Sequence, residues 1–350
     1  MVNKAIRIVI VVSGILNWIV LIRNAFDGFH YVHKSQSRHA SWVEMVRVQK
    51  RNYSDHHLLH FQSCSDLPVQ TERLRRPYVS TISLIDLHKK YHAGVDGHFS
   101  PPNCVTKEKI AIIVPLHGRL DGCFILLNNL IPVLKNQNKD FSIFVIEQVS
   151  DAPFNKALLM NAGFVEAIKQ DVFTCFIFHD EDLIPVTNSV PYECPFNQLH
   201  HLSVNVSSFN HTVQEHRVGG VVAMTSQLFK SVNGFSNLYF GHGYEVQDMF
   251  QRLKALNIST VDARKRDGIF VRIGDTGNRA NIRNEDGLKL LDAVSRRPQH
   301  EGLNTLKVSV GLPGRMNVAN VLTRKQISFD ADYYLKQIDA ILKKKSFPLN

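Results

Sequence analysis

Runs of apolar residues alternate with helix-like patterns through the middle of the chain. Residues 110–114 are wholly apolar and end at Pro115, as expected of a buried strand. Residues 124–137 then carry apolar side chains at helical spacing, and residues 141–146 form a second strand-like run. These segments predict a strand, a helix and a strand in succession, the order of a parallel pair joined by a crossover.

The same alternation continues along the chain. Ser150 or Asp151 can cap a second helix that runs to about Lys169, and residues 175–178 form a third strand. This order implies right-handed crossovers and a mainly parallel sheet flanked by helices. The predicted fold class is therefore α/β and Rossmann-like in the general sense, although the sequence contains no G-x-G-x-x-G. Ligands of such sheets bind at the carboxyl ends of the strands.

The C-terminal half is less regular. Two glycines precede a short strand at 221–224, the next helix ends at Gly234, and another helix is predicted at 245–256. Residues 262–297 are charged and loop-like. Residues 330–345 show a basic amphipathic helix pattern, which we interpret as a surface appendage.

The N-terminus carries an apolar run at residues 8–22, with Lys4 and Arg7 before it and Arg23 after it. A membrane span normally needs about 17–25 residues, but thin early-secretory membranes accept shorter ones. Positive charge before the run favours a cytoplasmic N-terminus. A cleaved signal peptide is the alternative, yet no convincing small-residue cleavage site follows Ile22. We therefore expect an uncleaved signal anchor.

The predicted organisation has five parts: a cytoplasmic tail at 1–7, a signal-anchor transmembrane helix at 8–22, a stem at 23–60, a lumenal domain at 61–325 and a basic amphipathic tail at 326–350. With 350 residues, 44% of them hydrophobic, the chain can form a sizeable core. Its formal net charge of +10 suits acidic partners such as nucleotides, phosphates or anionic lipids. The sequence has no zinc-finger spacing and no aromatic-basic pattern, so nucleic acid is not an expected partner.

Glycosylation and cysteine patterns agree with a lumenal location. The acceptor asparagines of four N-glycosylation sequons are Asn52, Asn205, Asn210 and Asn257. The five cysteines contain no C-x-x-C pair, so a zinc site is not expected. In an oxidising lumen four of them could pair and one would be left over.

Acidic residues follow the third predicted strand. Asp180 and Asp182 are two residues apart, so in an extended chain their side chains share a side. At a strand end they could hold Mg²⁺ or Mn²⁺ between diphosphate oxygens, because hard divalent ions prefer oxygen ligands. Solvation of the strand end is the competing explanation. Arg119, which follows the first strand, favours binding of an anion at this edge of the sheet.

Several segments fall in register with those of known sugar transferases. They are Ile110 to Pro115 with Arg119, Phe154 to Lys156, Leu159 with Gly163 and Phe164, Thr174 to Pro185, Gly219 to Val221, Asn233 to Phe235, and Gly302 to Asn304. Over about residues 60–325 the chain resembles the β-1,4-galactosyltransferases and is identified as a divergent member of that family. The resemblance implies a GT-A-type fold.

The resemblance also implies a function. Such a protein would be a type II Golgi membrane enzyme that transfers galactose or a related hexose from a UDP-sugar to a glycoprotein or glycolipid sugar, with inversion. Mn²⁺ would neutralise the leaving diphosphate, and a carboxylate would serve as general base. The family pattern pairs Cys64 with Cys104 and Cys175 with Cys194, which leaves Cys123 as a buried thiol.

The family motifs assign roles to residues of this chain. The implied donor-binding residues are Pro115, Arg119, Phe154, Lys156, Asp180, Glu181, Asp182 and Arg272. Asp182 would also ligate the metal ion. The implied acceptor-binding residues are His242, Tyr244 and Glu245.

The departures from the family pattern fall on the chemistry. Val246 stands where the family has the carboxylate usually assigned as base, and His242 replaces a tryptophan. Glu245 and Asp248 remain as candidate catalytic carboxylates. The competing interpretation is that Glu245 caps a helix and that Asp248 faces solvent or a salt bridge.

The metal ligands are altered as well. Ile269 and Arg272 stand where the family has a methionine and a histidine, so Mn²⁺ binding is expected to be weakened or lost. Arg272 could place a guanidinium where the metal sat, because arginine also binds diphosphate. His242 as a replacement ligand is a further alternative. Two functions stay open: an active glycosyltransferase with a changed mechanism or donor, and an inactive member that binds nucleotide or glycan or assists a partner enzyme.

Overall fold

The structure is a computed structural model that describes residues 62–67, 76–91, 97–118, 120–207, 219–241, 243–273, 285–294, 301–311 and 322–343. All of these lie in the unit Phe61–Asn350. The predicted tail 1–7, anchor 8–22 and stem 23–60 are outside the described residues, and so are Arg119, His242, Asn52 and Asn210. No helix within the described ranges is long and apolar enough to cross a membrane.

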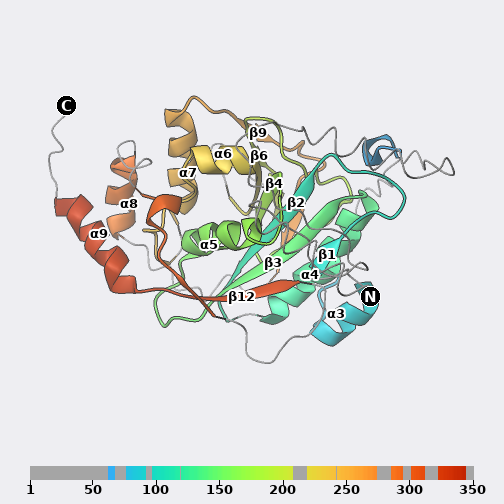
Figure 1. The fold of residues 1–350 in the computed structure, drawn as a ribbon, viewed down its shortest axis with the longest axis horizontal. Coiled ribbons are helices and arrows are strands. Elements are labelled where there is room, and N and C mark those ends of the chain that lie inside the picture. The colour runs from blue at the N-terminus through green and yellow to red at the C-terminus, as the bar shows by residue number, and fades with distance from the viewer. Residues whose placement is uncertain are drawn as a thin grey trace, which may run out of the picture. The chain divides into compact units, whose positions relative to one another are not determined.

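The centre of the fold is a mixed sheet whose strand order is β11-β12-β3-β2-β4-β8-β6-β9, with β1 beside β3 (Figure 1). The four central strands β12, β3, β2 and β4 run parallel, whereas β1, β11 and β8 pair antiparallel with their neighbours. The strands are β1 His98–Phe99, β2 Lys109–Leu116, β3 Asp140–Gln148, β4 Cys175–His179, β6 Leu199–His201, β8 Val221–Thr225, β9 Thr260–Asp262, β11 Ser309–Gly311 and β12 Thr323–Ser328. The predicted α/β fold with a mainly parallel centre is thus confirmed.

Helices cover both faces of this sheet because its central strands are apolar on both sides. In β2, Ile112 and Val114 join the core under helix α4 (Leu120–Asn136), whereas Ala111 and Ile113 join the core under α5 (Lys156–Ile168). The remaining helices are α3 Leu84–Tyr91, α6 Ser226–Ser231, α7 Glu245–Ala255, α8 Glu285–Asp292 and α9 Ala331–Lys343. Short 3₁₀ turns occur at Cys64–Asp66 and Leu303–Thr305.

Helix α5 begins later than the sequence predicted. Its N-cap is Asn155, whose side-chain Oδ1 accepts the N–H of Leu158 over 3.0 Å. Gln148 at the end of β3 accepts the Asn155 N–H over 2.9 Å and donates to the Ala152 carbonyl over 2.7 Å. These bonds hold the chain before Asn155 as a loop, so the predicted cap at Ser150 or Asp151 was wrong.

Part of the segment expected to be loop-like forms a second sheet of three strands. Its order is β5-β10-β7, with β5 Leu183–Pro185, β10 Ile269–Arg272 and β7 Asn205–Val206. Strand β10 is antiparallel to β5 and parallel to β7. Residues 262–297 therefore contribute β10 and α8 rather than loop alone, and β10 brings its end to the acidic segment that follows β4.

The C-terminal part belongs to the domain instead of forming an appendage. Strand β12 adds to the central sheet beside β3, and its Ile327 is buried in the core. Helix α9 buries Tyr334 and Ile338 and lies beside α8 (Figure 1). The predicted boundary between residues 325 and 326 falls inside β12. The sequence does not reveal this strand because most of its side chains are polar and only partly buried.

Both predicted disulfides are confirmed. Cys64 pairs with Cys104, and Cys175 at the start of β4 pairs with Cys194. Cys123 is a free thiol buried on α4. Burial raises its pKa to about 12, so it stays protonated at neutral pH.

Candidate functional site

The acidic segment after β4 lies at the carboxyl edge of the parallel strands. Asp180, Glu181 and Asp182 occupy the turn between β4 and β5. The Asp180 N–H donates to the Gly220 carbonyl over 2.9 Å, and the Ile273 N–H donates to the Asp182 carbonyl over 2.8 Å. Backbone bonds from two other segments therefore fix where both carboxylates are placed.

Gly220 allows this close approach of backbone. Its φ is +74°, a left-handed conformation that favours glycine. An added Cβ would lie 2.6 Å from Leu183 Cδ1 and 2.6 Å from Ser203 Oγ. A side chain at this position would push β8 away from the acidic turn, which explains a glycine before β8.

Strand β10 places Arg272 beside Asp182. In the β10–β5 pairing Arg272 lies opposite Leu183, the residue after Asp182. Its Nη1 donates to Asp182 Oδ2 over 2.5 Å, and the two side chains are 15% and 6% exposed. A charge-assisted bond so short and so shielded from water is among the stronger polar contacts of a protein. The fold therefore neutralises Asp182 with a fixed guanidinium.

A cavity of about 450 Å³ adjoins this ion pair. Glu181, Asp182 and Arg272 line one side of it, and the first turn of α4 lines another. The remaining lining residues are Val79, Ile125, Val271 and Ile273, with Asp121 and Gly122 on α4. The cavity thus joins an acidic turn, a guanidinium and the positive end of a helix dipole.

Lys156 is held by carboxylates on the other side of the acidic turn. Its Nζ lies 2.6 Å from Asp180 Oδ1 and 4.0 Å from Glu245 Oε1. Burial lowers the pKa of Lys156, but Asp180, Glu245 and Asp182 together outweigh that effect and raise it. Lys156 is therefore a fixed cation at neutral pH.

Two rings lie in the segments that follow the ends of β2 and β3. Phe154 and His117 have nearly parallel rings, with centroids 5.8 Å apart and planes 8° apart. The Phe154 carbonyl accepts the Gly241 N–H over 2.7 Å, which fixes its backbone. Pro115, by contrast, is buried within β2. The two rings therefore stack on each other at the carboxyl edge.

Helix α7 begins with two of the predicted acceptor residues. Glu245 is its first residue, and its Oε2 accepts the Gly243 N–H over 3.0 Å. The carboxylate therefore supports the helix start, as the competing interpretation expected, while also facing Lys156. Tyr244 has a φ of +71°, and its ring packs against Gly287 of α8, where an added Cβ would lie 2.5 Å from Tyr244 Cδ2.

Asp248 has a structural role that excludes it as an exposed catalytic base. It is fully buried, its Oδ1 accepts the Arg252 Nε–H over 2.5 Å, and its Oδ2 accepts the Tyr239 hydroxyl over 2.9 Å. Arg252, also fully buried, donates to Glu301 Oε2 over 2.7 Å. This network ties α7 to the turn at Glu301, so Asp248 forms the salt bridge that the competing interpretation expected and lacks the exposure of a catalytic base.

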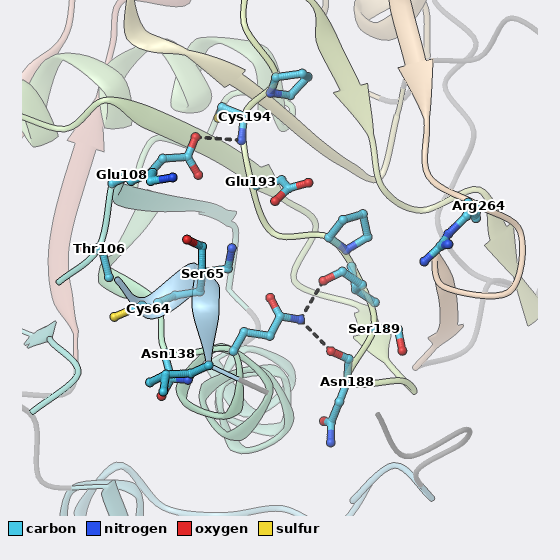
Figure 2. A pocket seen from close by; sticks show the side chains of 17 residues that line it. Cys64, Ser65, Thr106, Glu108, Asn138, Asn188, Ser189, Glu193, Cys194 and Arg264 are labelled. Atoms are coloured by element: carbon cyan, nitrogen blue, oxygen red, sulfur yellow. Dashed lines mark hydrogen bonds between the residues drawn. The ribbon is translucent and has the colours of Figure 1, made fainter. Parts of the chain in front are cut away.

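A larger cavity, of about 640 Å³, lies elsewhere (Figure 2). It is lined by the first disulfide, the loop before Cys194 and the residues that precede β2 and β3. Figure 2 shows Glu108 and Cys194 on one wall, where the Cys194 N–H donates to Glu108 Oε1 over 3.2 Å. This is the amino end of the sheet, and none of the predicted donor or acceptor residues lines it.

Sequence comparison relates the chain to known transferases. Two family models match it, the N-terminal region of glycosyl transferase group 7 over residues 65–195 and the N-terminal domain of galactosyltransferase over residues 200–275. The chain is 36% identical over 220 residues to human β-1,4-galactosyltransferase 1, covering 61% of this chain and 54% of that protein. The chain belongs to the β-1,4-galactosyltransferase family.

The chain is also similar to other sugar transferases. A β-N-acetyl-D-glucosaminide β-1,4-N-acetylglucosaminyltransferase of Lymnaea stagnalis is 37% identical over 203 residues, 57% of this chain and 41% of that protein. Drosophila β-1,4-galactosyltransferase 7, solved with manganese, UDP-Gal and xylobiose, matches with a TM-score of 0.54 and 25% identity over 65% of this chain and 98% of that chain. The chain spans about half the length of the curated relatives it matches.

The residues present do not fit the manganese ion that this Drosophila member of the family binds. The described residues include no group of three or more His, Cys, Asp or Glu side chains arranged to hold a metal. Asp182, the implied ligand, carries the Arg272 guanidinium instead. A divalent ion at Asp182 would lie against a fixed positive charge, which disfavours it electrostatically.

The structure also describes Val246, which stands where the family has its catalytic base. Val246 is the second residue of α7, directly after Glu245, and an added Cβ on Gly219 would lie 3.2 Å from Val246 Cγ2. The side chain therefore faces the glycine pair before β8. A valine there cannot accept a proton, so Glu245 is the predicted carboxylate that stays at the site.

Some site residues were not predicted from sequence. His117 is not among the predicted site residues, because its ring alignment with Phe154 depends on where two strands end. Asp121 and Gly122 line the cavity because α4 starts beside the acidic turn. The sequence signal for all three is their place directly after the first apolar strand, where parallel sheets bind ligands.

Proposed function

We propose that this protein binds a UDP-sugar and acts as a glycosyltransferase on a sugar acceptor. The observation that carries the proposal is the alternation of cations and carboxylates at the carboxyl edge: Lys156 with Asp180, and Arg272 with Asp182. Both pairs lie where parallel α/β sheets bind nucleotides. Membership of the family and the UDP-Gal bound to the Drosophila relative support a nucleotide-sugar donor.

The proposed reaction is a single displacement with inversion, transferring galactose or a related hexose. The acceptor hydroxyl oxygen forms a bond to the anomeric carbon of the donor sugar while the bond from that carbon to the UDP oxygen breaks. The hydroxyl proton passes to Glu245, the predicted base, and the electron pair leaves with UDP. Lys156 and Arg272 face the negative charge that develops on the diphosphate.

A catalytically inactive donor-binding protein is the second candidate. Two observations favour it: Val246 stands in place of a carboxylate, and Arg272 forms an ion pair with Asp182 Oδ2. In that case the fold would still bind nucleotide or glycan, or assist a partner enzyme. An inactive member that binds the donor differs from the transferase in turnover and not in donor binding.

One experiment tests the proposal and separates the candidates. The full chain, purified in detergent, is incubated with UDP-Gal and with other UDP-hexoses, in the presence of N-acetylglucosamine, xylose and glycoprotein acceptors. Transfer of labelled sugar to any acceptor supports the transferase. Binding of UDP without transfer supports the inactive member, and absence of both contradicts the proposed donor site.

We also propose a Golgi location with type II topology. The apolar run at 8–22 behind Lys4 and Arg7, the four sequons and the two disulfides support a lumenal domain. Epitope tags at the two ends, combined with protease protection of sealed vesicles, test this. A protected C-terminal tag and a digested N-terminal tag are the expected result.

A further inference from the structure

We propose that Arg272 is the resident cation of the donor site, so that a nucleotide diphosphate binds to this protein without a divalent metal ion. The inference deepens the proposed function and rests on it. It starts from the disagreement between the Asp182–Arg272 ion pair and the manganese bound by the Drosophila relative.

The position of Arg272 is set by backbone and not by a mobile side chain alone. Pairing of β10 with β5 puts Arg272 opposite Leu183, and the Ile273 N–H donates to the Asp182 carbonyl over 2.8 Å. Arg272 is 15% exposed, so neighbouring atoms restrict its movement. The guanidinium is thus preorganised at Asp182, which lowers the entropic cost of presenting it to an anion.

Guanidinium chemistry suits a diphosphate. The group is planar, stays charged at all physiological pH values and has five N–H donors, so one bond to Asp182 is compatible with bonds to phosphate oxygens. Arg272 lines the 450 Å³ cavity together with Glu181 and the start of α4. Lys156 supplies a second cation across the same acidic turn.

The charge balance predicts the strength of binding. Lys156 and Arg272 carry two positive charges, whereas Asp180, Asp182 and Glu245 carry three negative ones, so these five side chains sum to −1. A divalent ion held by one carboxylate would contribute +1 where the Arg272–Asp182 pair contributes zero. Diphosphate binding should therefore be weak, sensitive to salt and dependent on each cation.

The first test measures UDP binding to the full chain by calorimetry, with EDTA and with Mn²⁺. We expect affinities within about twofold of each other, since no metal takes part. Arg272→Gln should weaken binding by about tenfold or more, and Arg272→Lys should weaken it less, because lysine keeps the charge but not the fork. Thermal unfolding of each variant checks that it is folded.

A matched control comes from an arginine elsewhere. Arg264 forms an ion pair of 2.5 Å with Asp267, is 70% exposed and lies outside the predicted donor site. Arg264→Gln should leave UDP affinity unchanged. A tenfold gain in affinity on adding Mn²⁺, or native affinity in folded Arg272→Gln, overturns the proposal. Absence of UDP binding under both conditions overturns it together with the proposed function.

The second test needs no nucleotide. Mn²⁺ alone is titrated with the full chain and followed by electron paramagnetic resonance, with Arg272→His as the positive control. The variant removes the guanidinium and adds an imidazole beside Asp182, a donor pair that suits Mn²⁺. The native chain should leave the free-ion spectrum unchanged. Mn²⁺ binding by the native chain overturns the role of Arg272, even where UDP binding upholds the proposed function.

Discussion

Lys156 and Asp180 form an ion pair of 2.6 Å that ties the start of α5 to the end of β4. Their side chains are 12% and 15% exposed. Lys156→Met should lower the free energy of unfolding at pH 7 by about 2–3 kcal/mol. The loss stays below the ~3–5 kcal/mol of a fully buried pair because some water reaches both groups. Urea unfolding of the native chain and of Lys156→Met measures this loss in the free energy of unfolding.

A double variant tests whether the pair itself is responsible. Asp180→Asn in the Lys156→Met background should restore about 1 kcal/mol or more, since it removes the carboxylate left without its cation. The raised pKa of Lys156 also sets the direction in which the stabilisation by this ion pair changes with pH. Its stabilisation is fully present below the unfolded value of about 10.4 and is lost only as pH rises through the folded value. Simple additivity of the two variants would refute the pairing.

Asp248 should matter for stability and not for donor binding. Asp248→Asn removes one of the two carboxylates that form ion pairs with the buried Arg252 and should cost about 3 kcal/mol, because it breaks a fully buried charge network. UDP affinity of the folded variant should stay within about twofold of the native value. Tyr239→Phe, which removes one neutral hydrogen bond to Asp248, should cost only ~1 kcal/mol. Selective loss of UDP binding in folded Asp248→Asn would show that this residue supports the donor site.

The central sheet could be predicted because its strands are buried on both faces. The strand runs at 110–114 and 141–146 are apolar throughout, and every residue of β2 after Lys109 is buried. The place of the acidic turn follows from strand order alone. Both disulfides, by contrast, came from family resemblance, because cysteine spacing leaves the pairing open.

The features that could not be predicted from sequence depend on contacts between segments that are far apart in the chain. Asp248 looks like a free carboxylate in sequence, and its burial depends on Glu301, which lies 49 residues beyond Arg252. Strand β12 has few apolar residues, and it becomes a strand by pairing with β3. The Arg272–Asp182 bond joins residues 90 apart. The sequence suggested Arg272 in the place of the metal ion as one alternative, but only the β10–β5 register shows that its side chain lies beside Asp182.

His179 should make the protein less stable in mild acid. It is fully buried, its Nδ1–H donates to the Asp180 carbonyl over 2.9 Å, and its Nε2 accepts the Tyr192 hydroxyl over 3.3 Å. Burial lowers its pKa to about 4. The folded form therefore stays neutral while the unfolded chain binds a proton below about pH 6.5, so stability present above that pH is lost as pH falls toward 4.

The expected loss between pH 7.5 and 5.5 is about 1–1.5 kcal/mol. Urea unfolding at both pH values, for the native chain and His179→Gln, isolates this contribution because other groups titrate equally in both. The variant should be less stable at pH 7.5 but should show a smaller drop on acidification. Equal drops in the two proteins would mean that His179 does not carry the pH dependence.

Of the two sequons in the described residues, Asn257 should be the glycosylated one. Asn257 is exposed after α7 with a φ of +54°, so a glycan could project into solvent. Asn205 lies in β7, where its N–H donates to the Gly268 carbonyl over 3.0 Å and its side chain is partly buried. In a secretory host, Asn257→Gln should remove one glycosidase-sensitive mobility step and Asn205→Gln none. The reverse pattern would contradict the accessibility argument.

Val246 offers the sharpest test of whether the chemistry can be restored. Aspartate is close to valine in size, and Val246 lies beside Glu245 against the glycines before β8. Val246→Asp would return a carboxylate to the family's base position and should raise the transfer rate by about 10²-fold, the lower end of what general base catalysis contributes. Labelled sugar transfer from UDP-Gal measures the change.

Val246→Asn is the matched control because asparagine has the same shape as aspartate but cannot accept the proton. If Val246→Asp accelerates transfer and Val246→Asn does not, the native chain has a donor site without an efficient base. Glu245→Gln should then abolish the slow native transfer while leaving that of Val246→Asp largely intact. Equal rates for the Asp and Asn variants, with both folded and both binding UDP, would show that the missing carboxylate is not what limits this protein.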